Sequence, residues 1–315
     1  MADVFTGATT AAGSGQLANQ ILTAYERSAR FALRDEAIWD QFAKVKPGNL
    51  TNPGNPVQFH FWNDMPVDTT PISEVTDVDA VGLSDTTVTI SPAEYGRAVL
   101  KTLRIMTDDF LVGWDADVAN LVNENMVKTV DLLARDAVDS ASNTTTVTGG
   151  ASSSLTAANV LTASLIRQQH ARLVRANVSP WFGDKYAAIL SPEVGYDLKS
   201  ETGDAGWLVP AAYVDTARIY NNEIGIWGGF KFIESNRTKL AIDGGNGSAD
   251  VHSSYFFGQE FLAKAESIAP RIVMGPVTDR LMRFRPIGWH AYLGYGILRQ
   301  PAVRILVSSS SIDLT

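Results

Sequence analysis

Apolar and polar residues follow a helical rhythm most clearly between residues 107 and 142. Thr107-Asp108-Asp109 can begin a helix, with two acids where the helix dipole is positive, and no Gly or Pro interrupts residues 114–142. These features predict one helix of about 35 residues, roughly 50 Å long. Its apolar stripe steps mainly by four residues, through Trp114, Val118, Val122, Met126, Val130, Leu133 and Ala137.

The spacing of this stripe also indicates what the helix does. A coiled coil needs steps that alternate between three and four residues, and this sequence keeps such heptads poorly. We therefore interpret the helix as a strut against which other elements pack. Its polar side carries two i,i+4 pairs with the acid first, Glu124–Lys128 and Asp131–Arg135, which stabilise an exposed helix face.

Before this helix, two stretches alternate between apolar and polar residues, as strands do. Residues 57–62 place Val57, Phe59 and Phe61 on one face, and residues 87–90 form the second strand. Prolines and acids dominate the middle of the segment, which we interpret as poor in large apolar residues. Loops of this length are uncommon in compact domains unless they bind something. The pattern predicts an extended, hairpin-like loop outside the core.

Shorter patterns cover the rest of the chain. Residues 1–15 are small and polar, and apolar residues at every fourth position predict a helix over residues 17–42. After the long helix, helices and strands alternate. Helices are expected at 156–176 and from Pro192 onward, and strands at 186–190, on both sides of Gly228-Gly229, and at 255–257.

The region from residue 280 to residue 307 is rich in strand patterns. Residues 289–298 are apolar at nearly every position, which is typical of a strand buried on both faces. We expect this strand to pack against the long helix.

Composition narrows the possible classes of protein. The 315 residues are 45% hydrophobic and 19% charged, which allows a packed core in two or three interleaved domains. The sequence has no cysteine, which excludes disulfides, thiolate metal sites and a cysteine nucleophile. Its start lacks the features of a secretory signal, and no run reaches the roughly 18 apolar residues of a membrane span. We expect a protein made and kept in a reducing cytoplasm, or in a particle assembled there.

Charge is unevenly distributed along the chain, whose formal net charge is −8. Residues 61–100 hold seven acids against Arg97 alone, whereas residues 264–315 hold seven basic and three acidic side chains. Such a split suits contacts between copies, although two solvated faces would give the same composition. An acidic chain is a poor ligand for nucleic-acid phosphates. The candidate contacts between copies are Asp64, Asp68, Glu74, Asp77 and Asp79 on the loop, and Arg280, Arg283 and Arg285 near the end of the chain.

A search for catalytic or ligand motifs finds none that is complete. The four histidines are scattered without metal-ligand spacing, and Gly244–Gly247 lacks the Lys-Ser/Thr of a phosphate loop. Asp77 to Gly82 resembles a calcium loop only in part, because Val81 and Val88 occupy positions that need oxygen ligands. We expect no catalytic residue, no cofactor and no metal.

The order of these parts resembles the major capsid proteins of tailed phages, which share the Hong Kong 97-like fold. Three stretches carry the resemblance: a strand running into a Ser-Pro helix start at 187–193, a Gly-rich strand ending in Glu-Ser-Asn at 226–236, and closing strands at 288–303. Each stretch is short, and the specificity comes from their order and spacing over nearly the whole chain.

The resemblance implies an α+β fold with five parts. These are an N-terminal arm (1–55), an extended loop with a peripheral-domain strand (56–103), a spine helix of the peripheral domain (104–154), an axial domain (155–262) and returning peripheral-domain strands (263–315). It also implies self-assembly into an icosahedral virion shell around phage double-stranded DNA, built in the host cytoplasm.

The partners expected from the resemblance are further copies, in hexamers and pentamers, with a scaffolding protein, a portal and a decoration protein. Packaged DNA would be contacted only non-specifically, and no membrane is expected. Two other interpretations stay open at the level of sequence. One is an encapsulin-like nanocompartment shell of the same fold, and the other is a hydrolytic enzyme with an unrecognised site.

Overall fold

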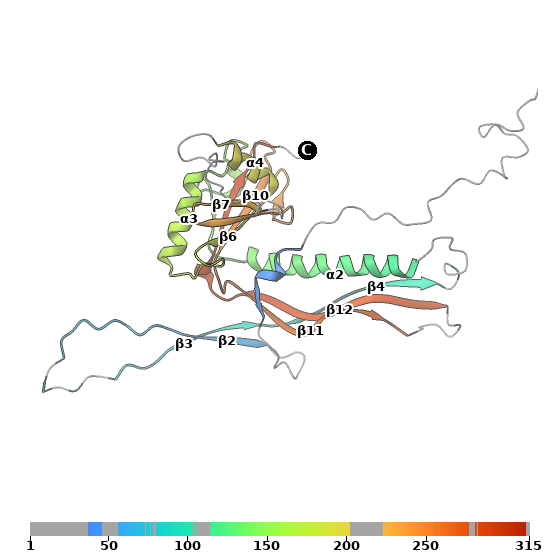
Figure 1. Ribbon diagram of the computed structural model, residues 1–315, viewed down its shortest axis with the longest axis horizontal. Helices are drawn as coiled ribbons and strands as arrows, with labels where there is room; N and C mark the ends of the chain where they lie inside the picture. The colour runs from blue at the N-terminus through green and yellow to red at the C-terminus, as the bar shows by residue number, and fades with distance from the viewer. Residues whose placement is uncertain are drawn as a thin grey trace, which may run out of the picture.

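The computed structural model describes residues 37–45, 56–72, 74–75, 77, 80–102, 104, 114–201, 223–276, 281 and 283–312. Their strands form a four-stranded sheet, a seven-stranded sheet and a separate two-stranded hairpin. Figure 1 shows the seven-stranded sheet above one end of the four-stranded sheet, with the hairpin projecting beyond that end. The fold is therefore α+β, as expected.

The long helix α2 (Trp114–Asp139) lies along one face of the four-stranded sheet. Val118 and Val122 of the helix share a buried cluster with Trp289 and Leu293 of the sheet, so the expected packing of the helix on this strand is confirmed. The sheet has the order β1 (Ala43–Val45), β11 (Leu262–Met274), β12 (Phe284–Ile297), β4 (Ala93–Thr102).

Helix α2 also reaches the second sheet. It has 26 residues, which correspond to about 39 Å, and its expected start at residues 107–109 lies outside the described residues. It ends at Asp139 rather than at residue 142. Ala134 and Val138, in its last turns, are fully buried in the core of the seven-stranded sheet. One helix thus packs in both cores, as a strut would.

Strand β12 is buried on one face only, and the expectation of two buried faces is wrong. Ile287, Trp289 and Ala291 face α2 and are buried, whereas His290 and Tyr292 between them are half-buried. The reason is that α2 covers one face of the sheet along its length. Within the described residues, the opposite face, called here the open face, is covered only near the end of β12.

The cover at that end is the base of the hairpin, formed by β2 (Val57–Trp62) and β3 (Asp85–Ile90). Val57 and Ile90 pack there with Ala263 and Ala265 of β11. Two glycines of β12 make room for the hairpin. A Cβ at Gly294 would lie 2.8 Å from the carbonyl oxygen of Ser91, and one at Gly296 would lie 2.9 Å from Cγ1 of Ile90.

The seven-stranded sheet carries helices α3 (Ala163–Arg175) and α4 (Pro192–Ser200) on one face. Trp39 and Phe42 pack on its other face, edge-on to Tyr255 and Phe257. The strand order is β5 (Thr144–Thr146), β13 (Val303–Ser309), β10 (Val251–Phe257), β6 (Tyr186–Leu190), β8 (Phe230–Glu234), β7 (Glu223–Trp227), and β9 (Leu240–Ala241) also pairs with β10.

Local sequence explains several element ends in this sheet. Gly228 and Gly229 both have positive φ, +57° and +86°, and they form the expected turn between β7 and β8. Ser191 begins α4, and its Oγ accepts a hydrogen bond from the backbone N–H of Val194 at 3.4 Å. Helix α3 begins at Ala163 rather than at residue 156, because Thr162 is still extended.

Two expectations about chain order need correction. Strand β13 does not return to the spine helix with β11 and β12; it pairs with β10 and β5 in the other sheet, because the short helix η6 (Gln300–Ala302) separates it from β12. Near the start of the described chain, the helix expected over 17–42 gives way to a 3-10 turn, η2 (Asp40–Phe42), and to β1, which pairs in parallel with β11. Residues 17–36 lie outside the described residues.

Candidate assembly surfaces

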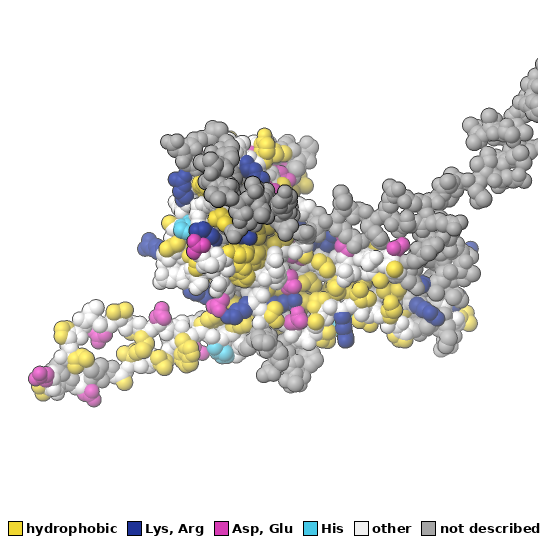
Figure 2. Space-filling view, in the orientation of Figure 1, with side chains coloured by type: hydrophobic (Ala, Val, Ile, Leu, Met, Phe, Trp, Pro, Cys, Tyr) yellow, Lys and Arg dark blue, Asp and Glu magenta, His cyan; other side chains and the backbone are white. Residues whose placement is uncertain are grey.

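The projecting hairpin exposes large apolar side chains far from either core. Val67 is 90% exposed, Val75 is 94% exposed and Trp62 is 75% exposed. The exposed set also includes Met65, Ile72, Val81 and Leu83, and Figure 2 shows these yellow side chains along the loop beside its acids. The interpretation of the loop as poor in apolar residues is therefore wrong. These residues are spread singly among prolines and acids, so no periodicity reveals them in the sequence.

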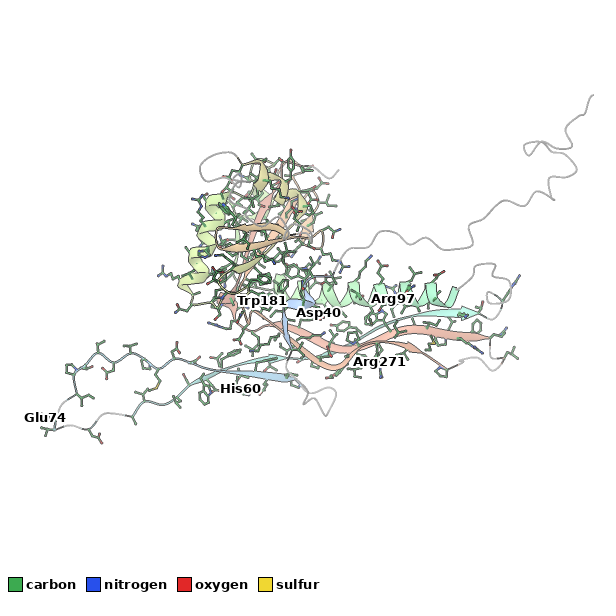
Figure 3. All side chains as sticks on the ribbon, viewed as in Figure 1. Asp40, His60, Glu74, Arg97, Trp181 and Arg271 are labelled. Atoms are coloured by element: carbon green, nitrogen blue, oxygen red, sulfur yellow. The ribbon has the colours of Figure 1, made fainter. Side chains whose placement is uncertain are left out.

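The acids of the hairpin lie at the opposite end of the molecule from the arginines expected to meet them. Asp64, Asp68, Glu74 and Asp77 lie on the loop, and Figure 3 shows Glu74 at its tip. Arg283 directly precedes β12 and Arg285 is its second residue, and this start of β12 lies at the far end of the four-stranded sheet. Asp79 and Arg280 lie outside the described residues. Contacts between these two groups therefore require two copies of the chain.

Two of these candidate residues have local contacts of their own. Two hydrogen bonds from Thr70, one from its side chain with the larger effect and one from its backbone, hold the pKa of Asp68 below its usual value. The guanidinium of Arg283 lies 5.3 Å from the centre of the Phe284 ring. Arg285 pairs across strands with Lys101, which places it on the face of the sheet that α2 covers.

The open face of the sheet carries a basic residue that the sequence interpretation missed. Arg271 of β11 pairs with His290 of β12, and Nε2 of His290 lies 2.7 Å from Oε1 of Glu94 on β4. Figure 3 shows Arg271 pointing away from α2. Exposed Leu100 and Val273 lie on the same face. The assignment of Arg271 to this face depends on the strand register, which the sequence does not supply.

The segment 37–45 is held by carboxylates where the two sheets meet. The backbone N–H groups of Ile38 and Trp39 donate to Oδ1 of Asp131, at 2.8 and 2.7 Å. Arg237 donates to the other oxygen of Asp131 at 2.8 Å. The expected exposed pair Asp131–Arg135 is therefore wrong, because Asp131 is buried. Asp40 in turn lies 3.1 Å from Nζ of Lys264 on β11. These contacts hold segment 37–45 at the junction of the two sheets.

Among the described residues, Ser191, His252 and Glu193 form a Ser–His–acid grouping, and its geometry is that of a packing contact. Oγ of Ser191 and Oε2 of Glu193 lie 3.1 and 3.8 Å from the same ring nitrogen of His252, Nδ1. A catalytic triad would place the acid and the serine on opposite ring nitrogens. His252 and Ser191 are both buried, and Ser191 is engaged as the cap of α4.

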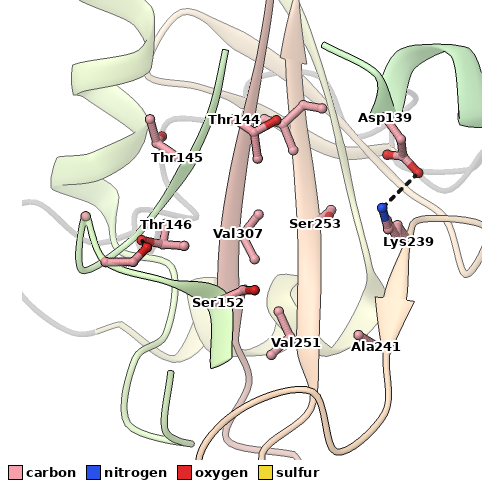
Figure 4. Close-up of a pocket in the computed structure, with 13 residues that line it drawn as sticks. Asp139, Thr144, Thr145, Thr146, Ser152, Lys239, Ala241, Val251, Ser253 and Val307 are labelled. Atoms are coloured by element: carbon pink, nitrogen blue, oxygen red, sulfur yellow. Dashed lines mark hydrogen bonds and ion pairs between the residues drawn. The ribbon is translucent and has the colours of Figure 1, made fainter. Parts of the chain in front are cut away.

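A pocket of about 470 Å³ lies on the face of the seven-stranded sheet opposite α3. Its floor is apolar, from Val251, Ile305 and Val307, and its rim carries threonine hydroxyls from β5. Figure 4 shows Lys239 and Asp139 at one side, 3.9 Å apart. Burial raises the pKa of Asp139, and its carboxylate accepts a hydrogen bond from Tyr255. Asp139 is therefore engaged by Lys239 and Tyr255 at the side of the pocket.

Two further kinds of site were sought in the described ranges. No group of three or more His, Asp or Glu residues there lies close enough to hold a metal ion. No helix in the described part of the chain has the length and apolar character of a membrane span.

A strut helix that joins two sheets, with a long hairpin projecting from one of them, is the arrangement of the capsid fold named above. No family model matches the sequence, and no curated protein matches it. Solved structures do match over nearly the full length of both chains.

Several of the matching structures are phage capsids. The capsid asymmetric unit of cyanophage Pam1 is similar with a TM-score of 0.74 and 14% identity, covering 96% of this chain and 100% of that one. The capsid of Helicobacter pylori bacteriophage KHP30 is similar with a TM-score of 0.70 and 12% identity, and the match covers 94% of this chain and 98% of that one. A chain of Mycobacterium phage Che8 is similar with a TM-score of 0.66 and 16% identity, and the match covers 91% of this chain and 96% of that one. The chain therefore has the fold of tailed-phage major capsid proteins, as expected.

Proposed function

We propose that this chain is a major capsid protein that self-assembles into the icosahedral shell enclosing phage double-stranded DNA. The hairpin carries the proposal. Its apolar side chains include Val67, which is 90% exposed, and Ile72, which is 78% exposed, and exposed apolar groups of this kind mark contacts between proteins. A two-stranded hairpin is also marginally stable alone, so a neighbouring copy would stabilise it.

We further propose that the hairpin of one copy lies across the open face of the next. Leu100 and Val273 there offer apolar contact, and Arg271 offers a positive charge to the loop acids. Arg283 and Arg285 stay candidates at the far end of the sheet. The acidic loop and Arg271 of the open face carry opposite charges, which favours this docking.

The remaining assignments follow from the fold and are also proposals. In them, 155–262 with β13 forms the axial domain, and α2 with the four-stranded sheet forms the peripheral domain, preceded by the arm of residues 1–55. Copies meet in hexamers and pentamers, with a scaffolding protein, a portal and a decoration protein as partners. The shell is built in the host cytoplasm and becomes part of the virion.

Electron microscopy of the expressed chain, alone and with its scaffolding protein, tests the proposal. Closed shells are expected for the native chain. A variant in which residues 64–83 are replaced by a short Asn-Gly turn should keep the melting temperature of the free subunit and form no shells. A persistent monomer with hydrolytic activity would contradict the proposal, and shells that enclose protein cargo and no DNA would favour a nanocompartment.

The electrostatic part of the docking has its own test. Replacing Asp77 and Asp79 together by Asn should weaken assembly and reduce its dependence on salt, because exposed ion pairs are screened as ionic strength rises. Light scattering at several salt concentrations measures both effects. Unchanged assembly at every salt concentration would show that these acids make no contact between copies.

A further inference from the structure

Helix α3 forms a basic surface on an acidic protein. Its sequence, Ala163–Arg175, contains Arg167, Arg172 and Arg175 and no acid, whereas the chain as a whole carries a net charge of −8. Figure 2 shows Lys and Arg side chains gathered at the outer side of the seven-stranded sheet, where Figure 1 places α3.

Arg172 lies near a second arginine on the sheet beneath the helix. Arg304 of β13 pairs with Phe256, and Phe256 contacts Phe230, whose ring meets His170 of α3. Arg304 therefore lies on the face that α3 covers. Burial and then the positive charge of Arg172 lower the pKa of the Arg304 guanidinium. Like charges repel each other, and an anion placed between them would relieve this repulsion.

Two buried N–H donors on this side of the sheet have no acceptor in the described part of the chain. Nε of Arg304 is buried and has no hydrogen-bond partner. Gln169 lies one turn before Arg172 on the same side of α3; it is 1% exposed, and its Nε2 also has no partner. In the described part of the chain, neither Arg172 nor Arg304 forms an ion pair with a carboxylate. A set of N–H donors without acceptors has the chemistry that recognises an oxyanion.

We propose that Gln169, Arg172 and Arg304 form an anion-recognition site that a carboxylate of a second copy completes. The inference rests on the proposed self-assembly. A second copy suits the site because acids outnumber bases in this chain, 34 to 26. Arg172 and Arg304 are half-buried, so a carboxylate from another copy can approach their guanidinium groups from outside. Such a contact is heterologous, the kind that closes rings of copies.

Assembly of two matched variants gives the first test. Arg172→Met removes the charge from the site, and Arg175→Met removes the same charge from an exposed position on the same helix. We expect Arg172→Met to reduce the yield of closed shells by about tenfold or more, since a hydrogen bond to a charged group is lost in each contact. Arg175→Met should assemble normally. Equal yields for Arg172→Met and the native chain would overturn the proposal.

The free subunit gives a second test that does not depend on assembly. Removing one of two adjacent like charges should raise the melting temperature of Arg172→Met above that of the native subunit. Inorganic phosphate, compared with chloride at equal ionic strength, should raise the melting temperature of the native subunit and not that of Arg172→Met. A lowered melting temperature in Arg172→Met, with an unchanged response to phosphate, would show a purely structural role.

The same variants separate the proposal from its competitors. If the native chain forms no shells at all, the proposed function fails, and the phosphate response still decides whether the site binds an anion. A gel-shift experiment with a DNA duplex tests the other possible ligand. If the native subunit binds the duplex and Arg172→Met does not, while both assemble equally, the site binds nucleic acid. The proposal of a second copy is then wrong.

Discussion

Asp131 joins three parts of the chain through one carboxylate. It is 1% exposed and accepts hydrogen bonds from the backbone of Ile38 and Trp39 and from the side chain of Arg237. A buried charge is tolerated only when its partners compensate it. This carboxylate therefore holds the segment 37–45 against the spine.

Replacing Asp131 by Asn should lower the free energy of unfolding by about 3 kcal/mol, because it leaves the largely buried guanidinium of Arg237 without its counter-charge. Urea denaturation of the free subunit measures the loss. Asp136→Asn is the matched control on the same helix; its carboxylate is exposed and should change stability by less than about 0.5 kcal/mol. Equal effects of the two changes would contradict this account.

His252 should make stability depend on pH. Burial lowers its pKa below the usual 6.5, while Glu193, Asp250 and Asp197 act in the opposite direction. The unfolded chain then binds more protons than the folded chain as pH falls through 6.5. The contribution of His252 to the free energy of unfolding is therefore complete above that pH and is lost as pH falls toward its folded-state pKa.

The corresponding experiment compares the native chain with His252→Gln. Urea denaturation at about pH 7 and about pH 5.5 should show a larger loss of stability on acidification in the native chain. The pKa of Asp139 is raised, so its contribution to the free energy of unfolding changes with pH in the opposite direction. This contribution is the same in both proteins and cancels when they are compared. Identical pH dependence would exclude His252 as the responsible group.

At the scale of elements, the hairpin crosses β12 over Gly294 and Gly296, which have no side chains. Gly294→Ala should destabilise this contact by about 1–3 kcal/mol, because the added Cβ meets the backbone of Ser91 and Pro92, which cannot move aside. Gly296→Ala should cost less, since its Cβ meets the side chain of Ile90.

Thermal unfolding and hydrogen exchange of β2 and β3 measure these changes. Gly82→Ala is the control, because a Cβ there meets nothing within 4 Å. If Gly294→Ala and Gly82→Ala gave the same melting temperature, the close approach of hairpin and sheet would not limit stability.

Elements whose neighbours are near in sequence could be predicted without a structure. The stripe of α2, the apolar strand β6, the Ser191-Pro192 helix start and the Gly228-Gly229 turn all follow from local spacing and backbone preference, and all are present. Even the packing of α2 on β12 followed from two long apolar patterns that each needed a partner.

Features that depend on register could not be predicted. Whether β12 is covered on one face or two depends on what lies over it, and its half-buried Tyr292 looks the same in sequence as its buried Trp289. Strand β13 carries a general apolar pattern that would suit either sheet. The cluster of Gln169, Arg172 and Arg304 requires knowing that α3 covers that end of β13, which no local pattern contains.

At the scale of the whole molecule, the hairpin should matter to assembly and not to folding. Replacing Val67 and Val75 together by Ser should leave the melting temperature of the free subunit unchanged, because both side chains are almost fully exposed. The same change should reduce the yield of shells, because the apolar contact with the next copy is lost. Differential scanning fluorimetry and electron microscopy of one preparation measure both. A lowered melting temperature would place these residues in a contact within the copy.

The position of β13 has a consequence for how a newly made chain reaches this structure. It follows every other described strand in sequence, yet it lies inside the seven-stranded sheet, between β10 and β5. Pairing of β5 with β13 must therefore wait until about residue 309 has left the ribosome, and contacts between such distant segments form slowly. Until then the apolar faces of β10 and α2 stay open to other nascent chains. A cell that makes many copies at once would need chaperones to keep them apart, and the waiting time would set how fast usable subunits accumulate.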